Sequence, residues 1–145
     1  MQTTVAIIGG GLSGLYAARL LHAENIDFHL FEARSRLGGR ILSVDRAGNP
    51  SDDGFDLGPS WFLPATQPEL AALTLELGLS AFPQYSDGDV LFERMSKEMV
   101  QRVRSIRREP ESMRLSGGTG ALVAALSAGL PPERLRLQCR LRHVE

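Results

Sequence analysis

The fold is decided by the stretch Val5-Ala6-Ile7-Ile8-Gly9-Gly10-Gly11-Leu12-Ser13-Gly14, in which an apolar run leads directly into the pattern Gly-x-Gly-x-x-Gly. Each glycine of the pattern has its own physical role in a unit that binds a dinucleotide. Gly9 permits the tight turn out of a strand, Gly11 lets a pyrophosphate approach the backbone, and Gly14 lets the next helix pack closely on the strand. That helix opens at Leu12 and Ser13, so its free N–H groups and positive dipole end would face the phosphates.

An acid completes this unit. Glu32 closes a second apolar run, at the distance after the glycines where such units carry the residue that binds a ribose. Its carboxylate would accept hydrogen bonds from ribose hydroxyls and would repel a 2′-phosphate, which argues against NADP. Strand, glycine turn, helix and acid therefore follow one another in the order of a dinucleotide-binding βαβ unit.

The residues next to Glu32 indicate which dinucleotide is bound. With Glu32 they resemble the Glu-Ala-Arg…Arg-x-Gly-Gly-Arg signature of the flavin-containing amine oxidase superfamily, and they read Ala33-Arg34-Ser35-Arg36-Leu37-Gly38-Gly39-Arg40. The resemblance, to monoamine and polyamine oxidases, implies FAD as the cofactor rather than NAD. Residue chemistry agrees, because Gly38 and Gly39 allow a second close backbone approach, and Arg34 and Arg40 bring positive charge to a doubly anionic pyrophosphate. The alternative, an ordinary glycine turn with solvated arginines, leaves the preceding fingerprint unexplained.

Later segments resemble the same family. Phe55-Asp56-Leu57-Gly58-Pro59-Ser60-Trp61 is similar to the stretch that passes beside the flavin ring, where Gly58 permits a close approach. Ser116-Gly117-Gly118-Thr119-Gly120-Ala121-Leu122 resembles the family's Gly-Gly turn, and Arg134-Leu135-Arg136-Leu137 the strand after it. Because the Gly-Gly pair does not follow a strand as a phosphate loop does, a helix start without a ligand is the favoured interpretation. The predicted cofactor-binding residues are Gly9, Gly11, Leu12, Ser13, Gly14, Glu32, Ala33, Arg34, Gly38, Gly39, Arg40, Gly58, Pro59, Ser60, Trp61 and Leu141.

The expected fold class is α/β, a Rossmann-like FAD-binding domain with a three-stranded parallel core and short additional strands and helices. We expect the parallel strands at 4–8, 27–31 and 134–139, and helices at 12–24 and 119–128. We expect residues 1–145 to form one domain, in which the resemblance implies that 63–115 are a reduced excursion toward a substrate lobe. Because family members are considerably longer, the resemblance implies the N-terminal portion of a flavin enzyme, apparently truncated.

Weaker signals lie between the second and third parallel strands. Short strands are expected at 41–45, 55–57, 81–85 and 89–92, the last two flanking the turn signal Asp87-Gly88. Thr66 and Glu69 have capping-box spacing, which predicts a helix that ends at Gly78. Helical spacing predicts an amphipathic helix with the apolar stripe Phe92, Met95, Met99, Val103 and Ile106. A solvated helix end is favoured over a patch for an anionic partner at Arg102, Arg104, Arg107 and Arg108, because acids interleave with them.

Composition narrows the functional classes. A net charge of −1 over 145 residues and a hydrophobic fraction of 43% indicate neither a nucleic-acid-binding surface nor disorder. No apolar run approaches the roughly 20 residues needed to span a bilayer, and the opening residues lack a basic signal-peptide region, so no membrane contact and a cytoplasmic location are expected. His22, His29 and His143 have no metal-ligand spacing. Cys139 has no cysteine partner and is expected to be buried in the third strand.

The resemblance implies a flavin-dependent oxidoreductase of the amine oxidase type, which transfers a hydride from the C–N bond of a small-molecule amine to flavin N5 and is reoxidised by oxygen. The alternatives are a non-catalytic FAD-binding fragment and a flavin desaturase or protoporphyrinogen oxidase-like enzyme, since all can share the N-terminal fingerprint. Many family members hold a lysine near N5, but the single lysine, Lys97, lies on the predicted solvated helix, so no catalytic residue is predicted. The isolated chain is therefore not expected to oxidise amines, and the free flank of its first strand is expected to favour a homodimer.

Overall fold

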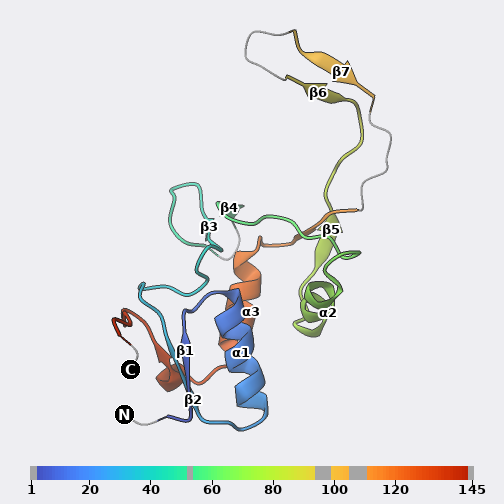
Figure 1. The fold of residues 1–145 in the computed structure, drawn as a ribbon. Helices are drawn as coiled ribbons and strands as arrows, with labels where there is room; N and C mark the ends of the chain where they lie inside the picture. The colour runs from blue at the N-terminus through green and yellow to red at the C-terminus, as the bar shows by residue number, and fades with distance from the viewer. Residues whose placement is uncertain (1–2, 52–53, 94–98, 105–110, 144–145) are drawn as a thin grey trace.

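A parallel three-stranded sheet forms the centre of the protein (Figure 1). The computed structural model describes residues 3–51, 54–93, 99–104 and 111–143. Its sheet has the order β1-β2-β9, with β1 at Val5–Ile8, β2 at Phe28–Phe31 and β9 at Leu135–Arg136. Both pairings are parallel, and Ile8 of β1 lies opposite Phe31 of β2. The predicted α/β Rossmann-like fold with three parallel strands is confirmed, and β1 lies at an edge of the sheet.

Two helices cover one face of this sheet. They are α1 at Leu12–Ala23 and α3 at Gly120–Ala128, which lie side by side in Figure 1. The side chains that they and β2 bury together are Leu15, Ala18, Phe28, Leu30, Leu122 and Leu126. Burying each large apolar side chain stabilises the fold by about 1.5–3 kcal/mol, so this layer is the hydrophobic core. On the opposite face Ile8 is 53% exposed, so the described residues cover the sheet on one side only.

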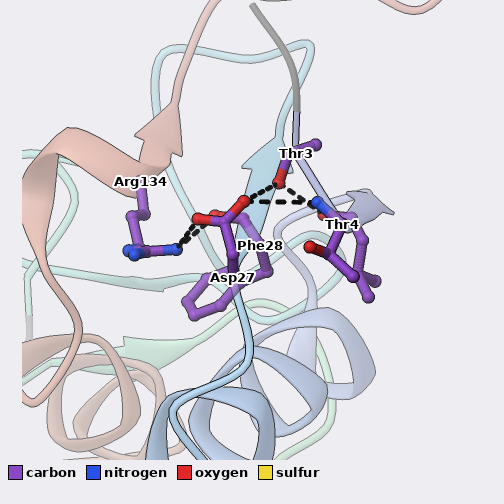
Figure 2. Close-up of polar contacts among 6 residues, drawn as sticks. Thr3, Thr4, Asp27, Phe28 and Arg134 are labelled. Carbon is purple, nitrogen blue, oxygen red and sulfur yellow. Dashed lines mark hydrogen bonds and ion pairs between the residues drawn. The ribbon is translucent and has the colours of Figure 1, made fainter.

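A polar clamp joins the strands at the end of the sheet where each of them begins (Figure 2). The Asp27 carboxylate accepts hydrogen bonds from the Thr3 hydroxyl at 3.0 Å and the Thr4 N–H at 3.2 Å, and pairs with Arg134 at 2.6 Å. The same Arg134 nitrogen donates to the Phe28 carbonyl, and the guanidinium lies 5.3 Å from the centroid of the Phe28 ring. The Thr3 hydroxyl first, then Arg134 and the Thr4 N–H, lower the pKa of Asp27. Residues before β1, β2 and β9 are thereby tied together.

The remaining elements are short. Antiparallel pairs join β3 (Ser43–Val44) to β4 (Phe55–Asp56), β5 (Ala81–Pro83) to β8 (Met113–Leu115), and β6 (Val90–Phe92) to β7 (Gln101–Val103). Helix α2 spans Pro68–Glu76, and a single 3₁₀ turn at Pro132–Arg134 leads into β9. No helix in the described part of the chain is long and apolar enough to cross a membrane.

Helix α2 starts differently from the prediction. Its N-cap is Gln67, followed by Pro68, and no side chain caps the helix, so the predicted capping box of Thr66 and Glu69 is wrong. The fixed φ of proline suits the first helical position and decides the start in its favour. The predicted end is confirmed, because Gly78 has a φ of 68° just beyond the helix.

The strands on either side of Asp87-Gly88 do not pair with each other. Instead β5 pairs with β8, whose Leu115 is buried, and β6 pairs with β7. Both strands were predicted correctly from the turn signal between two apolar runs, but the turn does not join them into a hairpin. The reason is tertiary, because pairing with β8 brings β5 next to the core.

The predicted amphipathic helix is wrong wherever it can be checked. Phe92 belongs to β6 and Val103 to β7, and these two strands form a ribbon that projects away from the rest of the molecule (Figure 1). Its apolar side chains are exposed on both faces, so no buried face imposes the alternation that marks a strand. Arg102 pairs with Asp89 at 2.6 Å. Outside the described residues lie Met95, Lys97, Ile106, Arg107 and Arg108.

The third parallel strand is shorter than predicted. It ends at Arg136, and a turn follows in which Gln138 has a φ of 55°. The expectation of a buried Cys139 is wrong, because this residue lies beyond the strand and is exposed. The backbone N–H groups of Gln138 and Cys139 still donate to the carbonyls of Arg34 and Glu32, both at 2.9 Å. The chain therefore continues alongside β2's end without forming a strand.

Candidate dinucleotide-binding site

The turn after β1 requires its glycines. Gly9 has a φ of 103°, and its N–H donates to the Phe31 carbonyl at 2.8 Å, which joins the ends of β1 and β2. A side chain at Gly14 would collide with the backbone of Gly9 and reach Ile7, so helix and strand pack as closely as the fingerprint predicts. A Cβ atom at Gly11 would meet only the Gly39 Cα, at 4.0 Å. The space beside Gly11 is thus open for a ligand.

The start of α1 is open to an anion. Gly11 is the N-cap, no side chain caps the helix, and its first turn contains no acid. Leu12 and Ser13 therefore begin the helix without a side-chain acceptor for its first N–H groups. These N–H groups and the helix dipole can bind a phosphate.

Glu32 is held in place by backbone N–H groups. The residue follows β2 and is only 7% exposed. Its Oε2 accepts the Gly10 N–H and its Oε1 accepts the Arg34 N–H, both at 2.8 Å. The bond from Arg34 is the largest cause of the lowered pKa of Glu32, and the Gly10 bond adds to it, while burial opposes both. The ionised carboxylate keeps further lone pairs, which can accept ribose hydroxyls.

Gly10 belongs to the site, although the fingerprint treats its position as variable. Gly10 donates its N–H to Glu32. A Cβ atom at Gly10 would also lie 2.6 Å from Leu37 Cδ2 and 3.2 Å from Glu32 Cβ, so a larger residue does not fit there. The signal in the sequence was the unbroken run of three glycines. The middle glycine of this run, Gly10, therefore binds the acid rather than the phosphates.

The second glycine pair lies directly on the first glycine loop. The Gly38 N–H donates to the Gly10 carbonyl at 2.7 Å, and Gly11 and Gly38 form a parallel bridge. Gly38 and Gly39 have φ values of 100° and 61°, and a Cβ atom at Gly39 would lie 3.2 Å from the Gly11 Cα. Two glycine segments that are far apart in sequence thus form one backbone surface.

The three arginines of this region have different surroundings. Arg36, which was not predicted as a site residue, donates to the carbonyls of Leu37, Gly39 and Ile41 at 3.0–3.1 Å and so shapes the second glycine loop. Arg34 donates to the Gly39 carbonyl at 3.2 Å. Arg40 is exposed and has no hydrogen-bond or ion-pair partner among the described residues. Arg40 is therefore the cation most available to a pyrophosphate.

The segment 57–61 continues the surface from the second glycine loop. The Leu57 N–H donates to the Leu42 carbonyl at 2.9 Å, and a side chain at Gly58 would collide with the Arg40 carbonyl. Pro59 and Trp61 are exposed and Ser60 is half-buried, while Phe62 next to them is buried. The close packing of Gly58 on the Arg40 backbone thus already requires a glycine here, whether or not a ligand also approaches it.

The remaining predicted residues lie at the margin. Ala33 is exposed beside Glu32, and Leu141, which is 46% exposed, lies in the extended stretch beyond Cys139. Within the described residues, no cluster of histidine, cysteine or acidic side chains could hold a metal ion. The site therefore offers backbone N–H groups, one buried acid and free arginine charge, a set that fits the phosphates and ribose of a dinucleotide.

Comparison with known proteins agrees with this geometry. Residues 7–77 match the family model of the NAD(P)-binding Rossmann-like domain, so fold and site define a Rossmann-like dinucleotide-binding domain. A probable flavin-containing monoamine oxidase A from Dictyostelium discoideum is 33% identical over 132 residues, which are 90% of this chain and 28% of that protein. Putrescine oxidase from Kocuria rosea is 37% identical over 93 residues, which are 63% of this chain and 18% of that protein.

A solved structure gives the same result. Wild-type putrescine oxidase bound to putrescine is similar with a TM-score of 0.61 at 32% identity, covering 75% of this chain and 23% of that chain. The chain is similar to flavin-containing amine oxidases, the family that its motifs resemble. It spans less than a third of the length of these relatives. The flavin in the relatives' names agrees with the predicted FAD.

Proposed function

We propose that this chain is the FAD-binding portion of a flavin-dependent oxidoreductase of the amine oxidase type. One observation carries the proposal, namely the Glu32 carboxylate, which the N–H groups of Gly10 and Arg34 hold beside two interlocked glycine loops. An ionised acid that is fixed only by backbone N–H groups keeps lone pairs for a ribose and disfavours a 2′-phosphate. The relatives that are named as flavin-containing support FAD over NAD.

Each part of the cofactor has a partner in this proposal. Glu32 binds the ribose of the adenosine half, Gly11 and the start of α1 bind the pyrophosphate, and Arg40 adds positive charge beside it. The segment 58–61 lines the flavin ring. When bound, FAD would supply the acceptor for the hydride equivalent lost from the carbon next to the amine nitrogen as the C–N bond is oxidised, and oxygen would reoxidise the flavin. A small-molecule amine is the proposed substrate, as the putrescine in the solved relative suggests.

Cofactor titration tests the proposal. The refolded or purified full chain is mixed with FAD, passed over a desalting column, and its visible flavin absorbance is compared with its protein content. We expect one FAD per chain, and we expect excess NAD not to displace it. Binding of NAD but not FAD would overturn the assignment.

A binding module without turnover is the second candidate. Within the described residues Leu57 is 67% and Trp61 is 54% exposed, so the expected ring-facing segment is open to water. Water exclusion strengthens electrostatic interactions in active sites and prevents side reactions. Hydrogen peroxide release on primary amines, secondary amines and polyamines separates the candidates: the binding module predicts FAD retention without peroxide, and the oxidase predicts both.

A further inference from the structure

A single carboxylate oxygen joins three segments that are far apart in sequence. Asp56 Oδ1 accepts the Ser43 hydroxyl at 2.6 Å, and both the N–H and the hydroxyl of Thr119 at 2.9 Å. Ser43 lies in β3, Asp56 ends β4, and Thr119 directly precedes α3. Figure 1 places β3 and β4 next to the end at which α3 begins.

This carboxylate caps α3 from outside the helix. Thr119 is the N-cap but makes no side-chain cap of its own, and the next N–H, of Gly120, donates to the Ser43 hydroxyl at 2.9 Å. Cβ atoms at Gly118 and Gly120 would each lie 2.8 Å from the network, the first from Asp56 Oδ1 and the second from Ser43 Oγ. Gly118 before α3 and Gly120 at its first position therefore admit the protein's own carboxylate and the Ser43 hydroxyl to the helix start.

The same network reaches the segment that faces the proposed flavin ring. The Thr119 hydroxyl lies 2.8 Å from the Pro59 carbonyl, so its single hydrogen is shared between this carbonyl and Asp56. On one side of Pro59, Gly58 packs on the Arg40 backbone, and on the other Phe62 exchanges two backbone hydrogen bonds with Met113. The Thr119 side chain thus holds the middle of the segment at Pro59, which lies two residues before the exposed Trp61.

We propose that Asp56 and Thr119 are positioning residues that set the place of Pro59–Trp61 against the flavin ring. This inference rests on the proposed function, because it assigns the ring to that segment. It goes beyond that function by giving the Gly-Gly turn before α3 a role in ring binding without any contact to FAD. Asp56 orients the Thr119 hydroxyl, and the hydroxyl holds the Pro59 carbonyl.

The test uses Thr119→Val, which removes the hydroxyl and keeps both the shape of the side chain and the backbone N–H that binds Asp56. Thr119→Ser restores the hydroxyl, and Ser43→Ala removes a bond of the network that does not reach Pro59. Two probes are titrated into each full-length variant. FAD carries the ring, and adenosine diphosphate carries the adenine, ribose and pyrophosphate without it. Trp61, the only tryptophan of the chain, reports on the segment by its fluorescence.

We expect Thr119→Val to raise the Kd for FAD about two- to tenfold, as the loss of one hydrogen bond implies, and to leave the Kd for adenosine diphosphate unchanged. At saturating FAD, Trp61 emission should be quenched less in Thr119→Val than in the wild type. Thr119→Ser should restore both values. Ser43→Ala should lower the unfolding midpoint while the ratio of the two Kd values stays that of the wild type.

The positioning role is overturned if Thr119→Val weakens FAD and adenosine diphosphate equally, because the effect would then be a general loss of structure. It is also overturned if FAD affinity and Trp61 quenching are unchanged, or if the wild type binds both probes equally well. A wild type that binds neither probe would instead refute the proposed function, and the positioning role would fall with it.

Discussion

The two ends of the parallel sheet each carry a carboxylate, and their surroundings differ. Asp27, where β2 begins, is bound by a hydroxyl, an N–H group and the guanidinium of Arg134. Glu32, where β2 ends, is bound by two backbone N–H groups. The pKa is lowered at both, but the Asp27 side chain is 45% exposed and the whole of Glu32 only 7%.

This difference separates a structural acid from a binding acid. The charge of Asp27 is neutralised by Arg134, so this acid needs no ligand to balance its charge. The charge of Glu32 is stabilised mainly by backbone N–H groups, with a smaller contribution from the Arg34 charge, and Gly10, whose N–H it accepts, adjoins the open space at Gly11. A low pKa alone would not have distinguished the two acids, whereas the kind of partner does.

The largest expected effect comes from the glycine that joins helix and strand at the Glu32 end. We expect Gly14→Ala to lower the free energy of unfolding by about 1–3 kcal/mol, because its Cβ would collide with Gly9. Glycine-to-alanine changes inside helices normally stabilise by about 1 kcal/mol, so the sign is diagnostic. Gly11→Ala is the matched control, since it should keep the stability and raise the Kd for FAD by about tenfold or more, which is 1.4 kcal/mol. Urea unfolding and FAD titration measure the two quantities, and equal stability of both variants would contradict the close packing.

Replacing each of the two acids by its amide tests the comparison directly. We expect Glu32→Gln to weaken FAD binding by about 1–3 kcal/mol, because the amide keeps one acceptor but loses the charge that binds the ribose hydroxyls. Asp27→Asn should leave the FAD dissociation constant unchanged and lower the unfolding midpoint. FAD titration and thermal unfolding of both variants are the measurements. If Asp27→Asn is fully folded and still binds FAD more weakly than the wild type, Asp27 is not a purely structural acid and the comparison of the two ends fails.

Acid should reveal both carboxylates through stability. Their pKa values in the folded protein lie below the ordinary 3.8 of Asp27 and 4.5 of Glu32. The stabilisation is therefore fully present above those ordinary values, and it is lost as the pH falls through the lowered folded pKa values. We expect the free energy of unfolding of the wild type to fall more steeply in this acid range than that of Asp27→Asn or Glu32→Gln. Identical slopes for all three proteins would show that the hydrogen bonds at these acids do not persist in solution.

The smallest effect is expected at Cys139, which touches the Glu32 end through its backbone only. Its N–H donates to the Glu32 carbonyl, while its side chain is exposed. Cys139→Ser should therefore change the free energy of unfolding by less than about 0.5 kcal/mol. In the folded wild type, the thiol should react with a disulfide reagent as fast as it does in urea. Slow labelling would mean that the side chain is covered after all.

Local signals predicted the centre of the molecule well. The apolar runs before Gly9 and Glu32 specify β1 and β2, since a strand and a glycine turn leave few alternatives in so short a distance. The fingerprint also identified the close packing at Gly14 and the position of the acid. Such features depend on neighbours in sequence, and their physical cause is local.

Contacts across long distances in sequence were not predictable in the same way. The bonds of Gly38 to Gly10, of Arg36 to three carbonyls and of Asp56 to Thr119 depend on where the chain returns in space. The β6–β7 ribbon misled the periodicity argument because its apolar residues face no core, so neither a period of two nor one of 3.6 has a physical cause there.

The register of β1 against β2 decides whether the Glu32 site can form. Ile8 lies opposite Phe31, which brings the next residue, Glu32, within reach of the Gly10 N–H. A slip of one residue would turn the acid to the opposite face of the sheet and leave that N–H without its acceptor. A ligand that binds only the correct arrangement stabilises it in proportion to RT ln(1 + [L]/Kd). FAD would thereby favour the correct strand register, and the fraction of chains that bind no FAD and stay colourless would measure the misregistered population.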